Sequence, residues 1–492
     1  MKLLSIGARA MLPLLLVAGV SYDISVTESD EKFEAQIEDF IAEPAVDQKN
    51  TLTSTWFCPA VHLRRINQKG IEATADLTIT NFSSEPVRVA VELVSTTSAN
   101  EFKVLEVPGF QMRQIDIGDI LGEELVSALV EASAGAVAVS RKFTSEFGTD
   151  ESACTNVLAE SLFALGGSTQ QGDVNEIVLY NPLSSDAIVD FQFATEAETG
   201  IFSVPELEGV VVPAGGNYRV DVGEVVRRRE TVATWVKTRV GKVVADYFQT
   251  FDGTDNDRGF STGLAGSNEA LRWSHSLEAF DPVKSSYLQV YNPTELVAEI
   301  TVSSGNSEGR TDGRDYLVGP FDILTLPISK ESPAAGSVDV ALDDNVLIVE
   351  SPSGVPVVSG LITSLKEIIE PHSAGNQTEE ELGKRALFVE RTISLGTSVP
   401  RLRWAVVLSP WENSNTHITV SNLSGNNTQV KIEDVGGKEI DGGLLEANST
   451  VRLVYGYVSA ALLVSAKDEI LIDVIRESKS EKLLSSSPKL GF

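Results

Sequence analysis

The chain has 492 residues, enough for several hydrophobic cores, and its 42% hydrophobic and 22% charged residues are the composition of a folded protein. It carries 70 acidic against 39 basic residues, a formal net charge of −31. This balance argues against nucleic acid and anionic lipid surfaces as partners, because phosphate binding requires clustered Lys and Arg. Solubility is the simplest reason for such a charge; adaptation to a saline medium and the collection of cations are alternatives.

The N-terminal segment predicts export. Lys2 and Arg9 precede an apolar run over residues 11–20, which has the length of a signal-peptide core and is short for a transmembrane helix. We expect residues 1–21 to be a signal peptide, with an uncleaved membrane anchor as the alternative. The protein is therefore predicted to be extracellular or associated with the cell envelope, and to touch a membrane only through this segment.

Residues 22–51 are predicted to be an acidic spacer. Between Asp23 and Gln48 there are nine acidic residues and one Lys, a composition typical of a solvated segment. A short amphipathic helix is the alternative, because Phe33, Ile37, Phe40 and Ile41 have helical spacing.

An internal repeat follows the spacer. Aliphatic residues stand two and four positions before each of four asparagines, and again eight and ten positions after it, as in Ile177, Leu179, Val189 and Phe191 around Asn181. Alternation with period two on both sides of a turn predicts a β-hairpin with one buried face. The asparagine is predicted to make the turn through a side-chain bond to its own backbone and its tolerance of left-handed φ. The four repeat-defining residues are Asn81, Asn181, Asn292 and Asn422.

Each repeat also begins with an aromatic residue and measures about 100 residues, with turn signals every 8–12 residues. These aromatic residues are Trp56, Phe163, Trp273 and Trp404. The pattern predicts an all-β protein of four tandem immunoglobulin-like β-sandwich repeats; a propeller blade has only about half this period. The predicted domains are 52–148, 153–253, 268–366 and 385–480, followed by a flexible tail over 481–492.

The connections between repeats are expected to be loops. Linkers are predicted over 149–152, 252–268 and 367–384, and the best helical pattern, residues 120–130, is predicted to be a crossover between strands. The half of the molecule beyond Glu367 is expected to be looser than the front half.

Two cysteines occur, Cys58 and Cys154. A lone pair in an exported chain indicates one disulfide, which is expected to staple the first two repeats together; two unrelated buried thiols are the alternative. The four scattered histidines share no ligand spacing with these cysteines, which argues against a zinc site.

Two short motifs resemble a catalytic site and a metal-binding site, and both are better explained as loops. Gly305 to Gly309 matches the G-x-S-x-G nucleophile elbow, but turn residues follow it where that motif needs a helix, so a hairpin loop is predicted. Asp252, Asp255 and Asp257 are a weak candidate Ca²⁺ loop; the full twelve-residue pattern and its terminal Glu are missing, which favours an interdomain loop.

Two further features suggest binding. Arg227, Arg228 and Arg229 form the one dense basic cluster, which could dock an anionic wall polymer or the carboxylates of a neighbouring domain, or be a solvated turn. Tryptophans can provide stacking platforms for sugars, although at strand starts they are more often core residues. The five are Trp56, Trp235, Trp273, Trp404 and Trp411.

Several of these strings resemble an uncharacterised family of secreted actinobacterial envelope proteins. They are the segments 56–59, 179–182, 211–215 and 249–253, together with the second Cys shortly before the next repeat. The resemblance runs from Trp56 to about Glu477 and departs in the second repeat, where Leu162-Phe163 stands in place of a Trp-Tyr type of pair. It implies export, envelope residence and the Cys58–Cys154 pair, and no catalytic activity.

The sequence contains no phosphate loop, dinucleotide fingerprint or zinc motif, so no cofactor is expected. The leading hypothesis is a non-enzymatic envelope protein with a structural or interaction role, whose partners are other envelope proteins or cell-wall glycans. A glycan-binding surface protein is the first alternative and an extracellular hydrolase the second.

Overall fold

The computed structural model describes residues 54–491 apart from 65–70, 118–124, 253, 255–257, 278–283, 307–308, 311–312, 330–339, 342–345, 368–387, 396, 399, 411–413, 457–460, 479–483 and 487–488. The predicted signal peptide and acidic spacer lie outside these residues. Nearly all regular structure in the described part is β-strand, in mostly antiparallel sheets, which confirms the predicted all-β sandwich class. No helix among the described residues has the length and apolar character needed to cross a membrane.

We group the strands into four units by their pairing. Unit 1 forms one continuous sheet that folds over itself, because β1 pairs with both β2 and β6. Its strands are β1 (Thr55–Leu63), β2 (Ala73–Asn81), β3 (Val87–Ser95), β4 (Glu101–Val107), β5 (Met112–Asp116), β6 (Leu125–Ala132), β7 (Val137–Ser145) and β8 (Gly148–Ala153).

Unit 2 separates into two sheets. It also holds a 3-10 turn (Pro205–Leu207) and the one-turn helix α2 (Val222–Val225), which Asp221 caps by accepting a bond from the Gly223 N–H. Its strands are β9 (Ser161–Gly167), β10 (Asp173–Asn181), β11 (Ala187–Thr195), β12 (Glu198–Ser203), β13 (Val210–Val212), β14 (Gly216–Asp221), β15 (Val232–Val240), β16 (Val244–Asp252) and β17 (Arg258–Leu264).

Unit 3 also has two sheets. Its strands are β18 (Arg272–Ser276), β19 (Lys284–Tyr291), β20 (Ala298–Asn306), β21 (Gly309–Arg310), β22 (Arg314–Val318), β23 (Ile323–Ser329), β24 (Val340–Ala341), β25 (Val346–Glu350), β26 (Val358–Glu367) and β27 (Phe388–Leu395).

Unit 4 contains one long strand, β33, that belongs to both of its layers. Its strands are β28 (Arg401–Val406), β29 (Ser414–Ser421), β30 (Thr428–Asp434), β31 (Glu439–Leu445), β32 (Thr450–Tyr455), β33 (Leu462–Ser478), β34 (Leu484–Ser486) and β35 (Lys489–Gly491).

The units share one strand order, shown here for unit 2. The first strand, β9, pairs with β15, which also pairs with β11; the second strand, β10, pairs with β14 and β16. The corresponding ladders of unit 1 are β1–β6–β3 and β5–β2–β7. In an immunoglobulin constant domain the first strand pairs with the second, and the last with the one before it. Here β9 lies in the sheet of β15 and β11, and β16 pairs with β10. The strands that correspond to the first and the last strand have therefore exchanged sheets.

Strand register relates the repeats residue by residue. The residue ten positions after each asparagine pairs with a valine, and three of these valines pair in turn with Trp56, Trp273 and Trp404. In unit 2 the matching valine, Val236, pairs with Leu162. The predicted repeat-start aromatic Phe163 is therefore one residue out of register: its side chain lies on the opposite face of the sheet and packs with unit 3 residues.

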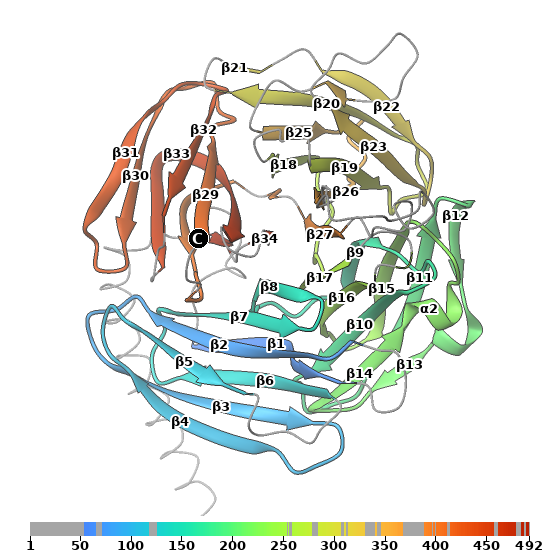
Figure 1. Cartoon of the computed structure of the whole chain (residues 1–492), viewed down its shortest axis with the longest axis horizontal. Helices are drawn as coiled ribbons and strands as arrows, with labels where there is room; N and C mark the ends of the chain where they lie inside the picture. The colour runs from blue at the N-terminus through green and yellow to red at the C-terminus, as the bar shows by residue number, and fades with distance from the viewer. Residues whose placement is uncertain are drawn as a thin grey trace, which may run out of the picture.

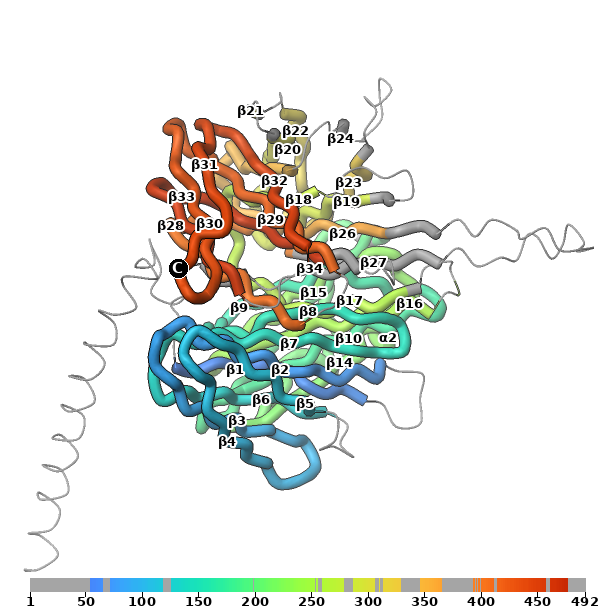
Figure 2. The backbone as a smooth tube through the Cα atoms, turned by 60° about the vertical axis from the view of Figure 1, so that its left-hand side comes forward, coloured from blue at the N-terminus to red at the C-terminus, as the bar shows by residue number. Residues whose placement is uncertain are grey.

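The four units close into a ring (Figure 1). In the turned view unit 4, in red, again lies beside unit 1, in blue (Figure 2). Val178 and Phe248 of unit 2 and Ala405 and Val407 of unit 4 all join the buried core of unit 1. The looser half expected beyond Glu367 is therefore not seen in unit 4, which packs against unit 1 as well as unit 3.

One late strand of each unit lies on the inner side of the ring. These strands, β8, β17, β27 and β34, each pair with the strand before them and lie near the middle of the ring (Figure 1). The linkers predicted over 149–152 and 252–268 are thus wrong as loops, since they contain β8 and β17. Buried polar residues such as Asp150 and Ser152 give these strands a loop-like composition.

Two other local expectations are wrong. The predicted crossover helix over 120–130 is strand β6 from Leu125 onward, because its apolar run is buried between β1 and β3. The predicted flexible tail contains β34, which pairs with β33, and β35, which pairs with β28.

Candidate functional site

Each repeat-defining asparagine forms a buried corner. Asn181 Nδ2 donates to the carbonyls of Ser185, Val212 and Pro213 at 2.8, 3.1 and 3.2 Å. Its Oδ1 accepts from the Leu183 N–H at 3.1 Å. Asn81, Asn292 and Asn422 make the same set of bonds, and all four are fully buried. These asparagines are structural: they tie the turn after one strand to the turn before another.

The left-handed backbone predicted at the asparagines is instead in the facing turn. Phe110, Gly215, Phe321 and Asn448 have φ of 54°, 60°, 53° and 55°. The N–H of each donates to the carbonyl of the residue two positions after the asparagine of its unit, for example Gly215 N to Leu183 O at 2.9 Å. None of the four asparagines has a positive φ, so that part of the predicted mechanism is wrong.

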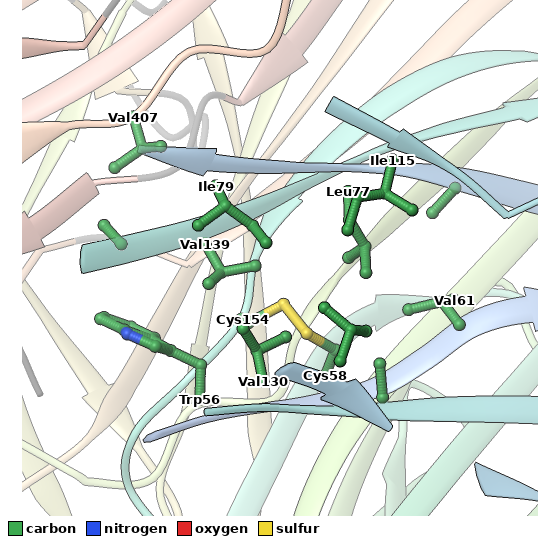
Figure 3. Packing of buried hydrophobic residues seen from close by; sticks show 14 of the residues in the cluster. Trp56, Cys58, Val61, Leu77, Ile79, Ile115, Val130, Val139, Cys154 and Val407 are labelled. Carbon is green, nitrogen blue, oxygen red and sulfur yellow. A yellow bond between two sulfur atoms is a disulfide. The ribbon is translucent and has the colours of Figure 1, made fainter. Parts of the chain in front are cut away.

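Cys58 and Cys154 form a disulfide in the core of unit 1 (Figure 3). Their Cα atoms are 4.6 Å apart, and the adjacent residues Phe57 and Thr155 exchange backbone bonds of 2.7 and 2.9 Å. The disulfide therefore joins the first strand of unit 1 to the segment that leaves the unit. It closes unit 1 itself, and does not staple unit 1 to the body of unit 2.

The candidate Ca²⁺ loop is only partly described. Asp252 Oδ1 accepts from the Thr254 N–H at 2.8 Å, while Asp255 and Asp257 lie outside the described residues. Across the parts of the chain that are described, no cluster of three His, Cys, Asp or Glu side chains could hold a metal ion.

The G-x-S-x-G string lies in a β-hairpin. Asn306 pairs with Gly309 across β20 and β21, as the hairpin prediction requires, and Ser307 lies outside the described residues. A nucleophile elbow needs a helix after the serine, and β21 occupies that place.

The basic cluster follows α2 in a turn held by its backbone. Thr169 exchanges two backbone bonds with the turn, accepting from Arg228 N at 3.0 Å and donating to Arg229 O at 2.9 Å. Arg227 and Arg228 are exposed, and Arg227 Nε donates to Glu224 O at 3.1 Å. This agrees with a solvated turn.

The tryptophans offer little for sugar stacking. Trp56, Trp273 and Trp404 are buried core residues, and Trp411 lies outside the described residues. The half-buried Trp235 stacks on Phe163 with centroids 5.6 Å apart, and its Nε1 donates to Ser161 Oγ at 2.6 Å. Lys237 Nζ lies 5.4 Å from the same ring, so this indole is already engaged within the protein.

A buried ion pair joins units 1 and 2. The guanidinium of Arg141 contacts both carboxylate oxygens of Asp246, with Nη2 to Oδ1 at 2.9 Å, and both side chains are fully buried. Arg141 also donates to Ala60 O at 2.6 Å and Ala153 O at 2.8 Å. Burial raises the pKa of Asp246, and the Arg141 charge opposes this shift.

A second buried ion pair closes the ring. Arg476 Nη1 lies 2.6 Å from Glu151 Oε1, joining unit 4 to unit 1, and both side chains are fully buried. Arg476 also donates to Ser409 O at 2.8 Å and Ser414 Oγ at 2.9 Å. Ser140 and Ser409 hydroxyls meet across the same interface at 3.2 Å.

Residues beside Glu151 extend these contacts around the axis. Asp150 Oδ2 accepts from the Thr262 N–H at 2.9 Å in unit 2, and Ser261 Oγ accepts from the Ile393 N–H at 3.1 Å in unit 3. Tyr247 donates to Ile393 O at 2.8 Å, and burial, followed by the Asp150 charge, raises the pKa of that phenol. The inner strands are thus joined by buried polar bonds.

We define Arg141, Asp246, Glu151, Arg476 and Asp150 as the axial cluster. Its carboxylates are held by guanidinium groups or backbone N–H groups and are buried, which suits a structural role and leaves no proton donor or acceptor facing solvent. Sequence reasoning missed the cluster, because the partners in its two ion pairs are 105 and 325 residues apart along the chain.

Part of the chain matches the model of a protein family of unknown function. The model of that family (DUF5719) matches residues 148–316, which begin with β8 and run through unit 2 into β22. No curated protein matches the chain.

Two solved structures are similar in part. A crystal structure of Thermotoga maritima 1070 is 16% identical, over 21% of this chain and 92% of that one, with a TM-score of 0.17. A tetra-tandem repeat in the extending region of a large adhesion protein is 11% identical, over 84% of this chain and 94% of that one, with a TM-score of 0.11. Such low TM-scores carry no argument about function.

Proposed function

We propose that this protein is an exported, non-enzymatic protein of the cell envelope, whose four units form one rigid body that presents surfaces to other envelope components. The observation that carries the proposal is ring closure. The last unit returns to the first and seals the contact with a fully buried Arg476–Glu151 pair, so the reactive side chains near the axis are used to hold the units together.

Two further observations support the location and the role. The Cys58–Cys154 disulfide indicates an oxidising compartment, because disulfides rarely persist in the cytosol. The net charge of −31 suits a protein that must remain soluble at a surface. We propose other envelope proteins or wall polymers as the partners.

The test is mild cross-linking of the tagged full-length protein in its native envelope, with a non-reducing gel of the same fraction. We expect a disulfide-containing protein in the exported fraction and a specific cross-linked component. Free thiols in a cytosolic fraction would overturn the export proposal. Cross-linking to nothing specific would overturn the interaction role, and turnover of generic glycan or peptide substrates would overturn the non-enzymatic one.

A further inference from the structure

Strand β4 is a free edge of unit 1. It is the terminal strand of the order β4-β3-β6-β1, and within the described part of the chain it pairs with β3 alone. An edge strand presents unpaired N–H and C=O groups that can accept another strand.

The outward side chains of β4 are unusually apolar for such an edge. Phe102 and Val104 alternate on one face and are 68% and 55% exposed. Charges on a natural edge strand oppose non-specific pairing, and β4 has Glu101, Lys103 and Glu106. The exposed apolar pair between these charges favours addition of a strand with matching side chains. A covering strand would remove these two side chains from water.

Acidic residues surround this apolar pair. Across the sheet Phe102 lies opposite Glu92, and Val104 lies opposite Ala90, which in turn lies opposite Glu131. Glu101 and Glu106 are exposed on β4 itself, and exposed Arg88 is the basic residue opposite Glu106. Lys103 donates to Asp116 O at 3.2 Å. Glu92, Glu131 and Glu106 share a face with Phe102 and Val104, so the surface selects a strand that presents both apolar and basic side chains on one face.

Other edges in the described residues fit a partner strand less well. Leu317 is the large exposed apolar residue on β22, β13 has three residues, and β31 has Gly442 and Gly443 in its middle. Glycine in a strand removes the side-chain contacts that fix register. β4 combines length, alternation and exposure.

We propose that β4 is a docking edge at which an extended segment of a partner protein, with apolar and basic side chains on one face, adds as a further strand. This rests on the proposed interaction role and names the chemistry of the partner. Main-chain bonds to β4 supply affinity, and contacts with Phe102, Val104 and the surrounding glutamates supply specificity.

The test uses a fluorescein-labelled peptide with valine and lysine in turn at every second position and threonine between them, so that both lie on one strand face. A second peptide of the same composition places valine on one face and lysine on the other. Fluorescence anisotropy is measured with the full-length protein at low and high salt. The key variant is Val104→Lys and the matched control is Val240→Lys, an equally sized exposed valine on the central strand β15, 52% exposed.

We expect the peptide with both residue types on one face to bind about tenfold more tightly than the peptide that separates them, and Val104→Lys to weaken it about tenfold while Val240→Lys has little effect. Equal binding of the two peptides, or equal effects of the two variants, would overturn the proposal, since plain attraction to an acidic protein would explain either. Self-association that Val104→Lys abolishes would identify a second copy as the occupant and also overturn it. A specific cross-linked envelope partner would still support the proposed function in those cases.

Discussion

At the residue scale, the corner asparagines explain why one residue type recurs through four otherwise divergent units. The Nδ2 group of Asn81 reaches the Val107 carbonyl, 26 residues away along the chain, as well as its own turn. A carboxylate could accept the local bond but could not donate to the carbonyls, and glutamine would place its amide one carbon too far. The chemistry of the corner therefore requires asparagine.

Removing one corner should be costly. Asn181→Ala leaves the buried carbonyl of Val212 and the partly buried carbonyl of Pro213 without this donor, and we expect the free energy of unfolding to fall by about 2–3 kcal/mol. Urea denaturation measures the change. The control is Asn426→Ala, in the exposed turn of unit 4. An Asn181→Ala effect no larger than that of the control would show that the corner bonds contribute little.

Asp76 should make stability fall as pH rises in the acid range. Burial and the nearby charge of Asp116 raise the pKa of Asp76 above its ordinary 3.8, against the opposing effects of Lys142 and Gln114. The folded state therefore binds this proton more tightly than the unfolded chain does. The stabilisation that the protonated Asp76 gives to the folded state is present below about pH 4 and is lost as pH rises through the raised pKa.

The variant Asp76→Asn should not show this loss of stability at higher pH. Because the side chain is only partly buried, we expect a gain of less than about 1 kcal/mol at pH 7, and none below pH 3, where Asp76 is protonated in both states. Denaturation at several pH values measures it. A loss of stability at pH 7 would mean that attraction to Lys142 outweighs burial and Asp116.

At the element scale, the segment that leaves each unit returns to the first strand of that unit. Phe57 pairs with Thr155, Phe163 with Gly266 and Ser274 with Thr397. In unit 4 the C-terminal strand β35 takes this place, with Ala405 opposite Leu490. Strand β35 thus occupies the position that the connecting segments take in the other units.

This equivalence predicts where a second disulfide can be engineered. Cys58 and Cys154 lie beside the Phe57–Thr155 pair, and Ala164 and Ala265 lie in the same way beside Phe163–Gly266. The double variant Ala164→Cys/Ala265→Cys should form an intramolecular disulfide in unit 2, because directly opposed residues of this kind have Cα atoms about 4.5 Å apart. Thiol titration and mass spectrometry without reductant measure it. Two free thiols in the folded variant would show that the units differ at this position.

At the scale of the whole molecule, Arg476 of unit 4 and Glu151 of unit 1 join the last unit to the first, although they are 325 residues apart along the chain. Replacing one partner of a buried pair leaves an unpaired charge, whereas replacing both can be nearly neutral. Ring closure can therefore be tested by comparing single and double variants.

Arg476→Met should lower the free energy of unfolding by about 3–5 kcal/mol, and Arg476→Met/Glu151→Leu should recover much of that loss. Thermal denaturation and hydrogen exchange at β8 and β33 measure the two effects. A double variant that is no more stable than the single one would show that the pair itself, and not the unpaired charge, supplies the stability.

The sequence by itself determined the all-β class, the positions of the four corner asparagines and a cysteine pair suited to a disulfide, because alternation, turn chemistry and cysteine count are local signals. The register error at Phe163 shows the limit of such signals: both Leu162 and Phe163 are apolar, and only strand pairing decides which faces the core of the unit. The inner strands β8 and β17 are predicted as linkers because many of their residues are polar.

Only the tertiary structure decided that the units form a ring and that β8, β17, β27 and β34 face its middle. Strand β8 can bury Asp150 and Glu151 because hydrogen-bonding partners from other units, Thr262 and Arg476, lie against them. Burial of a charge depends on groups that are distant in sequence, and no local pattern records where those groups will be.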